Sequence, residues 1–272
     1  MATKTENNGI ILFPDFQALK DEVERMKTEL SMLLSERDEL QFVVAKNINA
    51  RYMLELGSLE YKAYKAQCAA LRLKRKIELI QALKNRQAPV VMANVEETLD
   101  AEFAAYQQKL EEQMEKMNEA IERSQCRELS SEENREFKKL YREVVKLLHP
   151  DLNPDASEAQ IKLFENAVQA YRSGDLGTLR MIHEMIAGQQ SMDDAGQDTW
   201  SILRKQREEL AGMIAAVRES IARIKAEYPF TVLEILNDSE KLSERRKELE
   251  YIMDYYNELI QFYAAKLQET LR

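Results

Sequence analysis

Apolar residues recur at steps of three and four along most of this chain, which constrains it to long amphipathic helices. In the first third the series comprises Leu19, Val23, Met26, Leu30, Leu33, Leu40 and Val44, with Arg37 as its one polar member. Steps of this kind make a narrow seam that suits a partner helix. Only 7 Gly and 5 Pro interrupt the 272 residues, and runs typical of strands are nearly absent. We therefore predict an all-α fold.

Prolines, glycines and capping residues divide the seams into segments. Pro89 separates the first seam from a second helix over about 95–127, which predicts an antiparallel coiled-coil hairpin. Pro229 likewise separates two seams in the last third and predicts a second antiparallel hairpin. The predicted organisation is a flexible tail (1–14), an N-terminal coiled-coil hairpin (15–128), a small helical module (129–188), a linker (189–198) and a C-terminal helical hairpin (199–272).

Charge and composition narrow the classes of function. Because the net charge is −9, the chain could bind nucleic acid only through a local basic patch. Cys68 and Cys126 are far apart and fit a reducing compartment, and no stretch approaches the roughly 18 apolar residues of a membrane span. With two histidines and no recognisable catalytic arrangement, we expect no metal site, no cofactor and no enzymatic activity. These features predict a cytoplasmic protein without membrane contact.

The most specific motif is His149-Pro150-Asp151, which lies between two helical segments. The helix before it has an apolar face of Phe137, Leu140, Tyr141, Val144, Val145 and Leu148. Its other face carries the basic residues Lys138, Lys139, Arg142 and Lys146. Ser130 predicts a capping box before this helix, and Ser157 predicts the cap of the next one. That next helix carries Phe164 and the pair Ala170-Tyr171.

This pattern resembles a J-domain of the DnaJ type over about residues 130–175. In that family the second helix bears a Tyr followed by a basic residue, as in Tyr141-Arg142, and it ends in the same tripeptide. Asn153-Pro154 is similar to the loop of many J-domains. Phe164 and Tyr171 match residues of the third helix that pack against the second. The resemblance implies a J-domain-like helical hairpin within the module 129–188.

The resemblance also implies a function and its residues. J-domains dock on the ATPase domain of DnaK-type chaperones and stimulate ATP hydrolysis. The partner-binding residues would then be His149, Pro150, Asp151, Lys138, Lys139, Arg142 and Lys146. The basic residues would steer the helix to an acidic surface, and Pro150 would fix the turn. We expect His149 and Asp151 at an exposed corner, where Asp151 accepts a bidentate bond from a partner arginine.

Two departures from the J-domain pattern support a different class of protein. The usual first-helix signature is missing, and Ile121 to Glu128 at the end of a long helix stand in its place. Glu143 stands where the family often has a second basic residue. The alternative is a coiled-coil scaffold that keeps a degenerate J-like segment. ATP hydrolysis by a DnaK-type chaperone, measured with and without this protein, separates the two.

Three further features leave the partners open. The basic run at 72–76 favours a solvated helix face over a nucleic-acid patch. The aromatic residues of the last helix fit a hairpin core and a surface for a client protein or partner equally well. They are Tyr251, Tyr255, Tyr256, Phe262 and Tyr263. Seams of this kind serve intramolecular hairpins and a homodimer equally well.

Overall fold

The computed structural model describes residues 14–125, 129–187 and 200–272, and the elements it describes there are all helical. This confirms the all-α prediction. The tail 1–14 and the linker 189–198 lie almost wholly outside the described residues. The N-terminal helical stretch comprises α1 (Pro14–Glu39), η1 (Leu40–Val44), α2 (Ala45–Tyr52), η2 (Met53–Gly57) and α3 (Ser58–Asn85), with η1 and η2 in π-helical geometry. Among the described helices, none combines the length and apolar character needed to cross a membrane.

The later elements follow the predicted breaks closely. They are α4 (Met92–Gln125), α5 (Ser131–Leu148), α6 (Glu158–Ser173), α7 (Leu176–Ala187), α8 (Trp200–Ala226), η3 (Phe230–Val232), α9 (Leu233–Asn237) and α10 (Ser239–Leu271). The chain forms two compact units, each built from two stretches of sequence. The first unit takes the described parts of 1–44 and 128–227, and the second takes those of 45–127 and 228–272.

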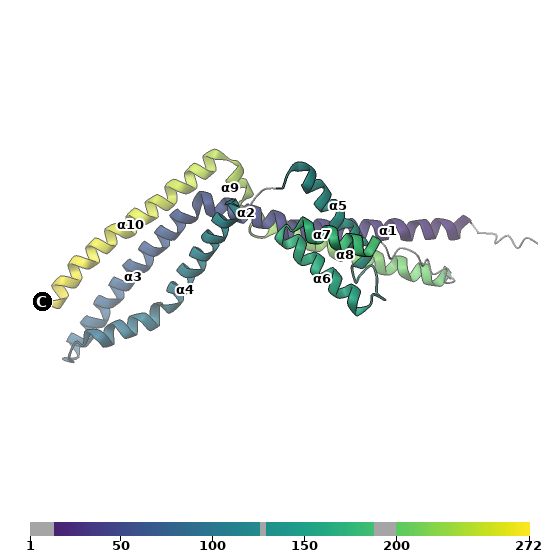
Figure 1. Ribbon diagram of the computed structural model, residues 1–272. Helices are drawn as coiled ribbons and strands as arrows, with labels where there is room; N and C mark the ends of the chain where they lie inside the picture. Colours follow the sequence, from purple (N-terminus) through teal and green to yellow (C-terminus); the bar gives the residue numbers. More distant parts are fainter. Residues whose placement is uncertain (1–13, 126–128, 188–199) are drawn as a thin grey trace, which may run out of the picture. The chain divides into compact units, whose positions relative to one another are not determined.

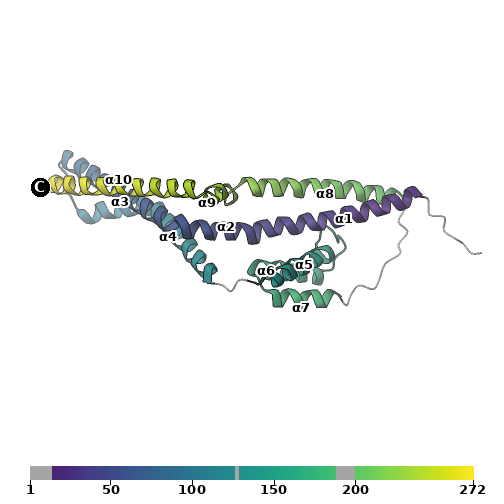
Figure 2. The same cartoon turned by 90° about the horizontal axis from the view of Figure 1, so that it is seen from above.

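In the first unit α1 pairs with α8, and the two helices run in parallel (Figure 2). Three ion pairs fix this direction because their positions rise together along both helices. Glu22 lies 3.8 Å from Arg207, Glu29 pairs with Arg218, and Glu36 lies 2.9 Å from Lys225. The buried seam between them includes Leu19, Val23, Leu30, Leu34, Leu203, Leu210, Ile214, Val217 and Ile221.

In the second unit α3 packs against both α4 and α10 (Figure 1). The α3–α4 pair is the predicted antiparallel hairpin, since Arg72 bonds Asp100 whereas the later Lys76 bonds the earlier Glu96. The α3–α10 pair runs in parallel: Glu60 near the start of α3 pairs with Arg245, and Lys84 near its end bonds Thr270.

The predicted C-terminal hairpin (199–272) is therefore wrong. Among the described residues α8 pairs with α1 and α10 pairs with α3, and both pairings are parallel. The predicted hairpin over 15–128 is correct where α4 packs on α2, η2 and α3, whereas α1 pairs with α8. The physical reason is that an apolar seam of this spacing accepts any matching seam, so the repeat does not specify its partner.

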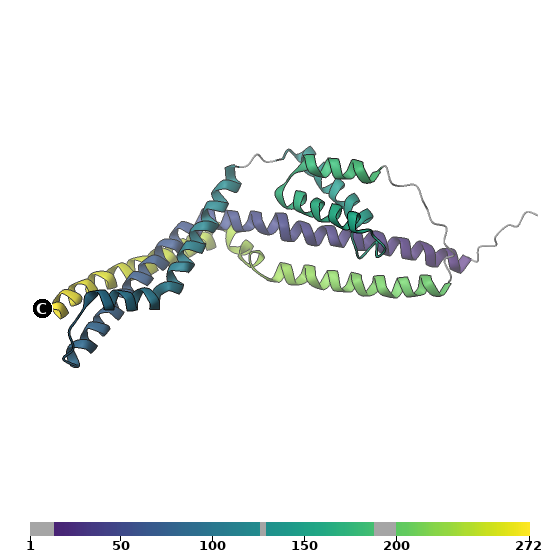
Figure 3. The ribbon, with the colours of Figure 1, turned by 60° about the horizontal axis from the view of Figure 1, so that its bottom comes forward.

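Helices α5, α6 and α7 pack against one another in the first unit, and α5 also packs on α1 (Figure 3). The predicted capping box at Ser130 is confirmed with Glu133, and the predicted cap at Ser157 is confirmed and forms a capping box with Gln160. Gly174 ends α6 in the left-handed region at φ 75°, which favours glycine. These local signals place the α5–α6 pair and the turn between them.

Candidate functional site: the turn between α5 and α6

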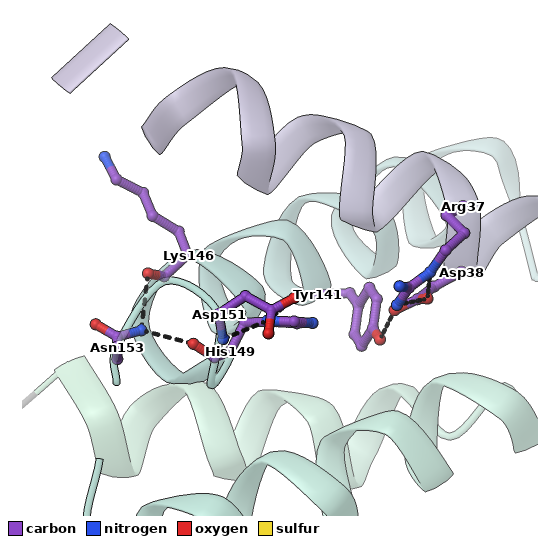
Figure 4. A network of polar contacts seen from close by, with 7 residues as sticks. All are labelled: Arg37, Asp38, Tyr141, Lys146, His149, Asp151 and Asn153. Atoms are coloured by element: carbon purple, nitrogen blue, oxygen red, sulfur yellow. Dashed lines mark hydrogen bonds and ion pairs between the residues drawn. The ribbon is translucent and has the colours of Figure 1, made fainter. Parts of the chain in front are cut away.

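The tripeptide His149-Pro150-Asp151 forms the turn that follows α5, with His149 as the C-cap residue (Figure 4). The His149 N–H donates to the Val145 carbonyl at 3.0 Å. The His149 carbonyl accepts the N–H groups of Leu152 and Asn153, each at 2.9 Å, and the Asn153 side-chain amide at 3.2 Å. The backbone of the turn is thus held by several bonds to one residue.

His149 is buried, with 7% of its surface exposed, so the expectation of an exposed histidine was wrong. Its ring packs edge-on against Phe164 of α6, with ring centroids 5.0 Å apart. Its Nδ1 accepts the backbone N–H of Asp151 at 3.1 Å, and this bond fixes the neutral tautomer with the proton on Nε2. The histidine therefore orders the turn from within.

Asp151 is the residue of the tripeptide that presents a charge to solvent. Half of its side chain is exposed (51%), and Oδ2 lies 3.8 Å from the Nδ1 of His149. Its backbone N–H donates to His149, and its half-exposed carboxylate can accept bonds from outside. Pro150 is also exposed. The exposed corner that the sequence predicted thus consists of Pro150 and Asp151.

Three aromatic rings brace the α5–α6 pair beneath this turn. The ring of Tyr171 in α6 stacks on Tyr141 at 3.8 Å between centroids and on Phe137 at 4.8 Å. All three side chains are buried, and Ala167 and Ala170 on the same face of α6 allow close approach. This confirms the predicted packing of Phe164 and Tyr171 against the preceding helix.

All four predicted basic residues of α5 are exposed: Lys138, Lys139, Arg142 and Lys146. Lys139 lies 3.9 Å from Glu143, and Lys138 pairs with Glu39 of α1. Within the described part of the chain, Arg142 and Lys146 make no ion pair. Two of the four predicted basic residues thus lie near a carboxylate, and the other two are available to a partner.

Glu143, which departs from the J-domain pattern, has an internal role. Its Oε2 lies 2.5 Å from the Nε2 of His183 in α7. Arg180 of α7 forms a second link to α5 through Glu136. These contacts hold α7 against α5, so the acidic residue contributes to the packing of the unit.

Sequence reasoning missed the contribution of α1 to this site. The Tyr141 hydroxyl donates to Asp38 Oδ2 at 2.6 Å, and both residues are buried. Arg37 donates to the other oxygen of Asp38 from Nε at 3.0 Å and from Nη2 at 2.7 Å. Burial, followed by the charge of Asp38, raises the pKa of Tyr141 well above its usual value. The hydroxyl therefore stays protonated and acts as a donor.

The suggested first J-helix at Ile121 to Glu128 is not the helix that packs on α5. Residues 121–125 belong to α4 in the other unit, and 126–128 lie outside the described residues. Among the described helices, α5 packs on α1, α6 and α7. Helix α1 lies about a hundred residues upstream of α5, so no local pattern could identify it.

The basic run at 72–76 is largely neutralised by α4. Arg72 bonds Glu96 and Asp100, and Lys76 bonds Glu96. Arg75 bonds Glu102 through two nitrogens, at 2.8 and 2.9 Å. These residues cross-link a helical hairpin, which agrees with the interpretation of the run as a helix face.

Comparisons with protein-family models, with curated proteins and with solved structures found no match. The J-domain resemblance therefore remains a prediction that depends on the residues of the turn and of the two helices around it.

The burial of His149 gives an expected pH dependence of stability. Burial, opposed by the charge of Asp151, lowers the pKa of His149 below its ordinary value of 6.5. The unfolded chain then binds more protons than the folded chain near this pH, so stability should fall as the pH decreases from about 7.5 to 5.5. Urea unfolding at both values checks this, with His149→Gln as the comparison. The variant should lose less stability on acidification than the wild type, and an equal loss would contradict this account.

Proposed function

We propose that this protein is a J-domain-type co-chaperone that docks on the ATPase of a DnaK-type chaperone and stimulates its ATP hydrolysis. One observation carries the proposal: the tripeptide His149-Pro150-Asp151 ends a helix with a basic outer face, and Phe164 and Tyr171 of the following helix brace it. The protein itself would make or break no bond, and it would act in the cytoplasm.

The contacts of the turn suggest how each group would act. Arg142 and Lys146 would attract an acidic surface of the chaperone over several ångströms and so raise the association rate. Asp151 would then accept a charge-assisted bond from a partner cation. His149 would act indirectly, because its buried ring holds the backbone of Asp151 in place.

The exposed aromatic residues of α10 suggest a role for the second unit. Tyr251, Tyr255 and Phe262 are exposed by 73%, 49% and 59%, and their spacing puts them on one face of the helix. They are therefore not the core of a hairpin. Exposed aromatic residues that share a face are typical of interaction surfaces. We propose that this face contacts the client protein or a targeting partner.

Single-turnover ATP hydrolysis by a DnaK-type chaperone tests the proposal, with Asp151→Asn as the deciding variant. Asp151→Asn should reduce the stimulation about tenfold, since one charge-assisted bond is lost. This variant is sharper than His149→Gln, which also alters buried packing. Asp155→Asn is the matched control, because it makes the same change at an exposed aspartate of the same loop. Absence of stimulation by the wild type, or equal stimulation by Asp151→Asn, would overturn the proposal.

A second candidate is a coiled-coil scaffold in which the J-like helices survive only as packing elements. The engagement of Tyr141 and Lys138 by α1 favours it, because these side chains are then used inside the protein. Under this candidate neither the wild type nor any variant of α1 stimulates the chaperone.

A further inference from the structure

The end of α1 covers part of the helix that carries the proposed docking residues. Tyr141 is only 1% exposed and its hydroxyl binds Asp38, while the adjacent Glu39 pairs with Lys138. Two successive acidic residues of α1 thus engage α5: Asp38 binds the buried Tyr141, and Glu39 pairs with Lys138, which the J-domain resemblance assigns to the partner-binding residues. The chain therefore holds an acidic ligand against its own basic helix.

The acidic corner of α1 is organised before any partner arrives. Arg37 binds one oxygen of Asp38 through two nitrogens, while the other oxygen accepts the Tyr141 hydroxyl. The Asp38 side chain is 4% exposed, and both of its carboxylate oxygens accept hydrogen bonds from within the protein. An acidic surface with fixed geometry is also what the basic face of α5 would meet on a chaperone.

The contact between α1 and α5 includes buried polar residues of α1. The buried polar residues of α1 are Ser31, Ser35 and Asp38, at spacings of four and three that share one helix face. Ser35 lines a groove of about 470 Å³ together with Tyr141 and Arg142. Polar contacts of this kind are more frequent in transient interfaces than in permanent ones. The pairing of α1 with α8 has its own ion pairs and would remain.

We propose that Asp38 and Glu39 act as an intramolecular competitor that occupies the docking helix until a DnaK-type chaperone displaces them. This inference rests on the proposed function and adds its regulation. Under such competition only the molecules in which the helix is free can bind the partner. The apparent affinity is therefore the intrinsic affinity multiplied by the fraction of those molecules. Weakening the contact between α1 and α5 therefore increases stimulation at low protein concentration.

Glu39→Lys tests the competition, because it replaces an attraction to Lys138 with a repulsion. The full-length variant should reach half-maximal stimulation of chaperone ATP hydrolysis at a concentration about fivefold lower than the wild type. Glu39→Gln, which only removes the attraction, should shift it in the same direction by less. Glu22→Lys is the matched control, since Glu22 lies on the same helix, pairs with Arg207 of α8 and does not line the groove beside α5. It should leave the concentration dependence of the wild type unchanged.

Folding of each variant is checked by the fluorescence of Trp200, the only tryptophan, which packs near Phe16 within the first unit. Stronger stimulation by both Glu39 variants, with Glu22→Lys equal to the wild type, supports the competition. Equal stimulation by all four proteins overturns it and leaves the co-chaperone function standing. Absence of stimulation by every protein overturns the co-chaperone function, and the competition with it.

Discussion

Tyr171→Ala should destabilise the first unit by about 3–5 kcal/mol, which is the usual cost of removing a large aromatic side chain from a core. The ring is 2% exposed and stacks on both Phe137 and Tyr141, so its loss leaves a cavity and removes two ring contacts. Because these contacts hold α6 against α5, we also expect the variant to lose stimulation of the chaperone.

Urea unfolding monitored by Trp200 fluorescence measures this effect, because the single tryptophan belongs to the first unit. Ile161→Ala is the matched control, since it removes a large apolar side chain from an exposed position of α6 in the same unit. The control should change stability by no more than about 0.5 kcal/mol. A cost below about 1 kcal/mol for Tyr171→Ala would show that the stack does not organise the unit.

The sequence predicted local elements well because their signals are local. Ser130 and Ser157 accept backbone N–H groups at the helix starts where the capping pattern placed them. Pro150 follows the end of α5 because a proline disfavours helix in the residue before it. Phe164 and Tyr171 also pack as predicted, since the resemblance fixed their spacing from the tripeptide.

The pairing of the long helices could not be predicted in the same way. The seam of Leu19, Val23 and Leu30 matches that of α8, but it would match an antiparallel neighbour equally well. The parallel direction is set in part by Glu29 with Arg218 and Glu36 with Lys225, and charged residues of both signs occur throughout the chain. The relative direction of two paired helices therefore depends on many weak interactions, and a single sequence does not show which of them dominate.

The contribution of Asp38 was missed for a related reason. A carboxylate in a charged helix is usually solvated, and its partner Tyr141 lies about a hundred residues away. The one available signal was the recurrence of Ser31, Ser35 and Asp38 on a single face, which indicates a polar contact without naming what it binds. Likewise, nothing near His149 showed that its ring would be covered by Phe164 and not exposed.

Asp38→Ala should cost about 3 kcal/mol, whereas a surface aspartate would cost about 0.5 kcal/mol or less. The substitution leaves the buried Tyr141 hydroxyl without its acceptor. Arg37 is partly exposed and can turn to water, so most of the loss comes from the tyrosine side. Asp21→Ala is the matched control, because Asp21 is an exposed aspartate of the same helix.

A double-mutant cycle with Tyr141→Phe separates this bond from other effects of the aspartate. Once the hydroxyl is absent, removing Asp38 should cost about 1–2 kcal/mol less than it does in the wild type. Tyr171→Phe in place of Tyr141→Phe should give no such coupling, because the bond to Asp38 comes from Tyr141. Additive costs in the first cycle would mean that α1 contacts α5 without this bond, and the competition inferred for Asp38 and Glu39 would then depend on Glu39 alone. Coupling in the first cycle alone would identify Asp38 as the residue that fixes α1 on the docking helix.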